Sequence, residues 1–174
     1  VAHTAARKLS EMFMLPISVF GAAAATFSSQ NLGANRIDRI KIAINKNIML
    51  IWIWSTIVII ATFTMAPLLI QLITGTKDTD IIKTATSYLR FNTPFYYVLC
   101  VLIVIRNAMQ GIGDRITPVL SSIIELAGKV AVVVYLAPKL GYFGIIISEP
   151  IVWILCSLLL GFKIRKNEVL MSKN

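Results

Sequence analysis

Long apolar runs without a charged side chain dominate the sequence. The longest covers residues 47–76, between Lys46 and Lys77. A helix needs about 20 apolar residues to cross the hydrocarbon core of a bilayer, so this run is long enough to cross with some tilt. A helix that packs on the core of a soluble protein alternates apolar and polar positions with a period of 3.6 residues, so that one face is polar. This run has no such polar face. The run is therefore predicted to span a membrane.

Further apolar runs precede and follow it, three of which carry one or two charged residues. The predicted spans are residues 12–32, 48–75, 92–112, 116–138 and 141–162. Two intervening segments, the basic 35–46 and the more mixed 78–90, carry apolar residues at helical spacing and are predicted to be amphipathic helices on the membrane surface. The fold class is therefore all-α, a polytopic membrane bundle of about five transmembrane helices within a single unit, residues 1–174.

Small residues lie within the first span, and turn residues lie between two later spans. The row Gly21 to Ala25 has side chains small enough to let a neighbouring helix approach closely. Gly111-Ile-Gly113-Asp114 predicts a tight turn, and Thr117-Pro118 is typical of a helix start.

The charge distribution favours a membrane partner over nucleic acid. The sequence is 57% hydrophobic with a formal charge of +9, but its basic residues stand in short clusters between apolar runs. Contact with anionic lipid explains such clusters better than nucleic acid does, and no nucleic-acid partner is expected. With five spans, nine of the 17 Lys and Arg residues lie on the side of the 36–46 segment and six on the other side. The positive-inside rule then predicts a multi-pass protein of the plasma (inner) membrane with a cytoplasmic C-terminus.

Enzyme chemistry is not indicated. The spans contain no histidine pair, nucleophile elbow or His-Glu-x-x-His sequence. Cys100 and Cys156 both lie inside apolar runs, where packing is their ordinary role. We therefore expect no catalytic residue, no metal site and no cofactor.

Polar residues within the spans are the candidate substrate or ion pathway. They are Glu125, Lys129, Arg106, Asn107, Gln110 and Gln30. Glu125 and Lys129 are one helical turn apart, which favours a mutually neutralised pair; the alternative is that Glu125 is a proton or cation site with Lys129 as its counter-ion. Arg106 is expected to extend toward the cytoplasmic face or to bind loop carbonyls near Gly111.

Three segments of the chain resemble one family of transporters. They run from Ala5-Ala6-Arg7-Lys8 to Gly33-Ala34, from Arg106-Asn107 through Gly113-Asp114 to Glu125, and from Gly141-Tyr142 to Glu149-Pro150 and Trp153. In this order they resemble the second half of the multidrug and toxic compound extrusion (MATE) transporters. The resemblance covers nearly the whole chain.

The resemblance implies a twelve-helix transporter of which this chain supplies helices eight to twelve. Because the chain opens without an initiator methionine, we expect it to lack an N-terminal part, including the first lobe. The implied activity is export of organic cations, drugs or metabolites in exchange for protons or sodium ions, with the substrate bound between two lobes. The coupling aspartate of similar bacterial proteins would lie in that missing N-terminal lobe, and residues 91–105 hold no carboxylate. Lys129 stands where many relatives carry arginine.

Two alternatives to export stay open. One is a flippase for lipid-linked oligosaccharides from the same superfamily, which predicts a more basic cavity. The other is a membrane scaffold subunit that transports nothing. A transport path needs two lobes that move about a central site, so we expect this chain alone not to be a competent transporter.

Overall fold

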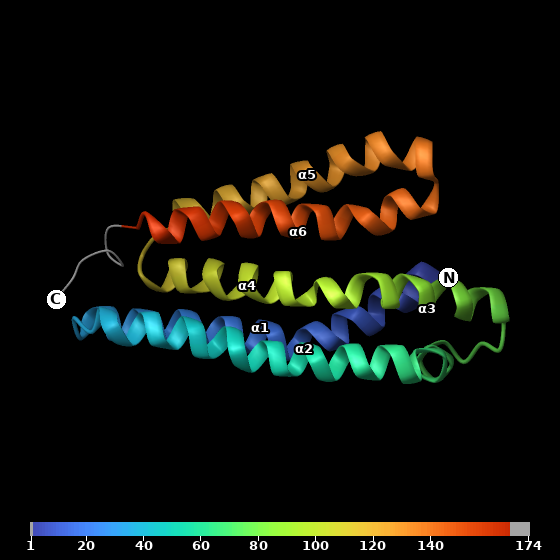
Figure 1. Ribbon diagram of the computed structural model, residues 1–174, viewed down its shortest axis with the longest axis horizontal. Coiled ribbons are helices and arrows are strands. Elements are labelled where there is room, and N and C mark those ends of the chain that lie inside the picture. The colour runs from blue at the N-terminus through green and yellow to red at the C-terminus, as the bar shows by residue number, and fades with distance from the viewer. Residues whose placement is uncertain (1, 168–174) are drawn as a thin grey trace.

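The computed structural model describes residues 2–167, and these residues form a bundle of long helices (Figure 1). In chain order the elements are α1 (Ala2–Gly33), α2 (Ile37–Thr74), α3 (Thr79–Asn92), the 3₁₀ turn η1 (Thr93–Phe95), α4 (Tyr96–Gly111), α5 (Ile116–Leu140) and α6 (Tyr142–Arg165). Tail residues 168–174, which contributed one lysine to the charge count above, lie outside the described part.

Five helical stretches are long and apolar enough to cross a membrane. They are Ala2–Gly33, Ile37–Thr74, Thr79–Gly111, Ile116–Leu140 and Tyr142–Arg165. The predicted all-α bundle of about five transmembrane helices is therefore confirmed, and the protein is a multi-pass membrane protein. Figure 1 shows α4 between two pairs, with α1 and α2 on one side and α5 and α6 on the other.

Both segments expected as separate surface helices are instead joined to a span. Residues 37–46 are the first turns of the unbroken helix α2, and α3 runs through η1 into α4. The apolar stripe that suggested a surface helix is present, but Ile37, Ile40 and Ile44 are buried in the bundle. At 1.5 Å per residue, the 38-residue α2 is about 57 Å long, so its ends extend beyond a hydrocarbon core of about 30 Å.

Two apolar clusters hold the bundle together. The larger centres on α4, whose Tyr96, Leu102 and Val104 pack with residues of α1, α2 and α6. The smaller lies at the other end, where Leu89 of α3 meets α1, α2 and the start of α6. The described part of α5 adds no buried residue to either cluster. Helix α5 is thus peripheral and packs chiefly on α6.

The row of small residues on α1 is where α4 approaches, as predicted. A Cβ atom on Gly21 would lie 2.8 Å from Cγ2 of Ile103 and 2.9 Å from Nδ2 of Asn107. A Cβ atom on Gly111 would collide with the backbone carbonyl of Ala25. Glycine at both positions therefore lets the α1 and α4 backbones come into close contact.

The predicted turn before α5 is also present. Gly113 has a φ of 88°, which favours glycine, and Asp114 then bonds the free N–H groups at the start of α5. Its Oδ1 accepts from the N–H groups of Ile116 and Thr117 at 3.1 and 3.0 Å, and its Oδ2 accepts from Oγ1 of Thr117 at 2.7 Å. Partial burial raises the pKa of Asp114, but these hydrogen bonds outweigh it and hold the pKa below its usual value.

A proline in α2 explains how α3 is fixed to that helix. Pro67 has no N–H, so the carbonyl of Phe63, four residues earlier, has no donor within its own helix. Nη2 of Arg90 donates to that carbonyl at 2.8 Å. The guanidinium of Arg90 also lies 5.8 Å from the centre of the Phe63 ring. Arg90 thus replaces the backbone donor that the proline removes.

Candidate functional site: an ion-pair network between α4 and α5

Glu125 lies between two cations at the contact of α4 with α5. Its Oε2 accepts from Nη2 of Arg106 at 2.6 Å, and its Oε1 is 3.2 Å from Nζ of Lys129. Nη2 of Arg106 also donates to Oγ of Ser121 at 3.0 Å. The side chains of Arg106 and Glu125 are about four-fifths buried, at 20% and 19% exposure. We refer to Arg106, Glu125 and Lys129 as the charged triad.

The local sequence places these groups on facing helices. Ser121, Glu125 and Lys129 are spaced four residues apart, so they form one stripe along α5. Arg106 projects from the penultimate turn of α4 toward that stripe. Within low-dielectric surroundings a close ion pair offsets much of the cost of removing its charges from water. The triad therefore holds the peripheral helix α5 against α4.

One sequence expectation for the triad is confirmed and another is wrong. The Glu125–Lys129 pair forms one helical turn apart, as its spacing predicted. Arg106 does not bind loop carbonyls near Gly111, because Glu125 of the neighbouring helix offers a charged acceptor within reach. No sequence pattern indicates this contact, since pairing across two helices depends on how each helix is rotated about its axis.

The remaining candidate residues lie apart from the triad. Asn107 faces α1 beside Gly21, and its Nδ2 donates to the carbonyl of Ile103 at 2.9 Å. Gln110 and Gln30 are exposed, and neither side chain bonds another described residue. The structure thus brings together three of the six candidates. It does not assemble all six into one pathway.

A second polar cluster lies at the opposite end of the bundle, and sequence reasoning did not find it. The hydroxyl of Tyr88 on α3 donates to Oε2 of Glu149 on α6 at 2.9 Å. Nδ1 of His3 on α1 lies 3.1 Å from the hydroxyl of Tyr142, and its ring meets the Tyr88 ring edge-on at 5.2 Å. These pairs are 61 and 139 residues apart in sequence, so spacing could not reveal them. They connect the start of α6 to α1 and α3.

The described residues present no metal centre. No group of three or more His, Cys, Asp or Glu side chains among them is arranged to hold a metal ion. Cys100 and Cys156 are both buried and unpaired, and they lie in the larger apolar cluster.

Comparison with known proteins assigns the family. The model of the MatE family matches residues 2–136, which is more than three-quarters of the chain. The chain belongs to the MatE family. No curated protein matches the sequence.

Two solved MATE structures share the fold. A crystal structure of a MATE mutant superposes with a TM-score of 0.85 at 13% sequence identity, over 95% of this chain and 38% of that one. The inward-facing conformation of a multidrug resistance MATE family transporter of the MOP superfamily gives a TM-score of 0.83 at 19% identity, over 94% and 38%. The chain thus spans well under half the length of the MATE chains it matches.

Proposed function

We propose that this MatE-family chain forms part of the second lobe of a secondary antiporter that exports organic cations, drugs or metabolites in exchange for protons or sodium ions. The observation that carries the proposal is the match of almost the whole helical bundle to 38% of a MATE chain. Transporters of this kind bind substrate between two lobes and open alternately to either side as the lobes rock. A first lobe must therefore accompany this one for transport.

The triad has a mechanical role in this proposal. Two cations and one carboxylate leave it with one net positive charge, which repels an organic cation or a sodium ion. Its three charges instead fasten α5 to α4, so that the α5–α6 pair moves together with the rest of the lobe. The coupling carboxylate then belongs to the first lobe.

The net positive charge of the triad is also the one observation that favours a second candidate. A flippase for lipid-linked oligosaccharides would carry an anionic phosphate, and a positive site within the membrane suits that cargo. The two candidates predict different cargoes for the same lobe, so a transport assay separates them.

The test uses membrane vesicles containing the two-lobe transporter and a fluorescent organic cation. An imposed proton or sodium gradient should drive dye movement, and adding dye should collapse the gradient. Glu125→Gln should lower the transport rate at least tenfold, because it leaves Arg106 and Lys129 unpaired inside the membrane. The matched control is Glu11→Gln, since Glu11 forms an exposed i,i+4 pair with Arg7 at 3.6 Å.

The outcomes separate the candidates. Absence of gradient-coupled dye movement would contradict the antiporter, and rescue of a flippase-deficient strain by the same protein would establish the second candidate. If the protein failed in both assays, the remaining candidate would be a membrane scaffold subunit that transports nothing. Coupled dye efflux by the 174-residue chain alone would contradict the need for a second lobe.

A further inference from the structure

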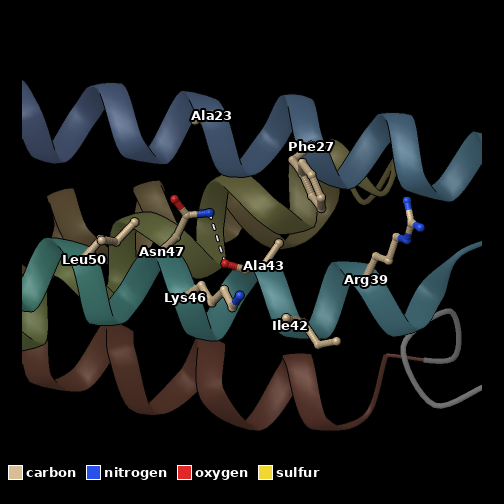
Figure 2. A pocket seen from close by; sticks show the side chains of 8 residues that line it. All are labelled: Ala23, Phe27, Arg39, Ile42, Ala43, Lys46, Asn47 and Leu50. Atoms are coloured by element: carbon tan, nitrogen blue, oxygen red, sulfur yellow. Dashed lines mark hydrogen bonds between the residues drawn. The ribbon is translucent and has the colours of Figure 1, made fainter.

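We infer that the groove between α1 and α2 binds an anionic glycerophospholipid, with the lipid phosphate held by Arg39 and Lys46. Figure 2 shows this groove with the side chains that line it. It does not overlap the charged triad. The inference requires only that α2 spans the membrane, so it stands independently of the transport proposal.

The groove has an apolar wall and a polar rim. Its volume is about 400 Å³, and Ala23 and Phe27 line it from α1. The α2 side contributes Ile42, Ala43, Asn47 and Leu50 together with the two basic residues. The side-chain amide of Asn47 donates to the carbonyl of Ala43 at 3.1 Å, so this donor is already used within α2. A ligand in this groove would contact apolar side chains along the wall and positively charged side chains at the rim.

The two basic side chains have no acidic partner among residues 2–167. The nearby carboxylate of Asp38 pairs with Arg36 at 3.3 Å instead. Arg39 and Lys46 are seven residues apart, or about two helical turns, so they lie on the same stripe of α2 about 10 Å apart along the axis. Two unpaired cations on one stripe form a complementary site for an anion.

The position of the groove along α2 identifies the anion as a lipid. Lys46 is the last charged residue before the uncharged run 47–76, so it marks the level where headgroups meet hydrocarbon. Arg39 lies toward water from this level, and Leu50 lies toward the bilayer centre. An anionic phospholipid has the same order of groups, a phosphate at the interface and acyl chains below it. A zwitterionic lipid fits less well, because its phosphate is balanced by its own cation.

Photo-crosslinking in nanodiscs tests the inference. The protein is placed in nanodiscs of phosphatidylcholine with a few per cent of photoreactive phosphatidylglycerol or, separately, photoreactive phosphatidylcholine, and crosslinked peptides are mapped by mass spectrometry. Phosphatidylglycerol should label the peptides around Ala23 and Lys46 at least fivefold more than phosphatidylcholine does. Arg39→Gln with Lys46→Gln should abolish that preference. Ala23→Phe, which fills the groove without changing charge, should remove labelling by both probes.

Each variant has a matched control. Lys41→Gln with Arg165→Gln removes the same charge at the same end of the bundle, and Lys41 lies on the opposite face of α2 from Arg39. Ala22→Phe places the same ring on an exposed position of α1 beside the groove. Both controls should retain the wild-type preference for phosphatidylglycerol.

Three results would overturn the inference. Equal labelling by the two lipids would show that the groove does not select anionic lipid. Absence of labelling by either lipid would show that another part of the protein or a partner covers it. If millimolar inorganic phosphate displaced the phosphatidylglycerol probe, and dilution of the probe with unlabelled phosphatidylglycerol did not lower the labelling, the site would be assigned to a soluble phosphate.

Discussion

Because Pro67 has no N–H, an arginine from another helix donates the hydrogen bond that the carbonyl of Phe63 would otherwise lack. In a bilayer, water does not bond a free carbonyl, so the group must find a partner within the protein. Arg90 serves the carbonyl of Phe63 at 2.8 Å and is itself exposed at the outside of the bundle. Its long side chain thus links α3 to α2 where the proline interrupts the hydrogen bonds of α2.

This arrangement predicts that the effects of substitutions at positions 90 and 67 are coupled. Arg90→Gln should lower the free energy of unfolding by about 1 kcal/mol, since the Phe63 carbonyl loses its donor. In a Pro67→Ala background the same change should cost less than half as much, because the alanine N–H bonds that carbonyl directly. Unfolding of the four variants in mixed detergent micelles measures this difference as a double-mutant cycle.

Arg115→Gln is the control for loss of an arginine, since Arg115 is exposed and its side chain bonds no other described residue. It should leave stability nearly unchanged. Equal costs of Arg90→Gln in both backgrounds would show that Arg90 does not act through the carbonyl freed by Pro67.

At the scale of elements, close backbone contact positions α4 against α1. No side chain fits at position 111, where a Cβ atom would meet the carbonyl of Ala25 and lie 2.9 Å from the Cβ atom of Ser28. Residues of α4 form the centre of the larger apolar cluster and also include Arg106 of the triad. A displacement of α4 from α1 would therefore disturb both the packing of the larger apolar cluster and the ion pairs of the triad.

Gly111→Ala should consequently destabilise the bundle by about 2 kcal/mol, a typical cost of forcing an extra carbon into a packed contact. Gly33→Ala is the matched control, because a Cβ atom there meets no atom within 4 Å. That change should be neutral or slightly stabilising, since alanine is the better helix former. Thermal unfolding in detergent compares the two variants. Equal effects would contradict the close approach of α1 and α4.

For the whole molecule, the ends of the bundle differ in charge and predict an orientation. The start of α2, the turn between α4 and α5 and the end of α6 lie at one end, and the loop between α2 and α3 lies at the other (Figure 1). The first end is the richer in Lys and Arg, which the positive-inside rule places in the cytoplasm. The predicted orientation therefore also places the C-terminal end of α6 on the cytoplasmic side.

Cysteine labelling in intact cells tests this orientation. Both native cysteines are buried, so a membrane-impermeant maleimide should leave the unmodified protein unlabelled. Lys77→Cys should be labelled from outside, whereas Arg36→Cys should react only after the membrane is permeabilised. The reverse pattern would invert the orientation. Labelling of both positions from outside would contradict a membrane-spanning α2.

The sequence alone determined the membrane class, the five spans, the turn at 111–114 and the pairing of Glu125 with Lys129. These features are local: hydrophobic length, turn residues and i,i+4 spacing act within one segment. The same local patterns also found the apolar stripe of Ile37, Ile40 and Ile44. They could not decide whether that stripe meets lipid or other helices.

The tertiary structure decided that question and all contacts between distant segments. The stripe on α2 is buried by the other helices, so residues 37–46 are the first turns of α2 and not a separate surface helix. Arg106 meets Glu125, and Tyr88 meets Glu149, because the bundle fixes the rotation and depth of each helix. Many side chains together set those two quantities through packing, so no single segment of the sequence contains them.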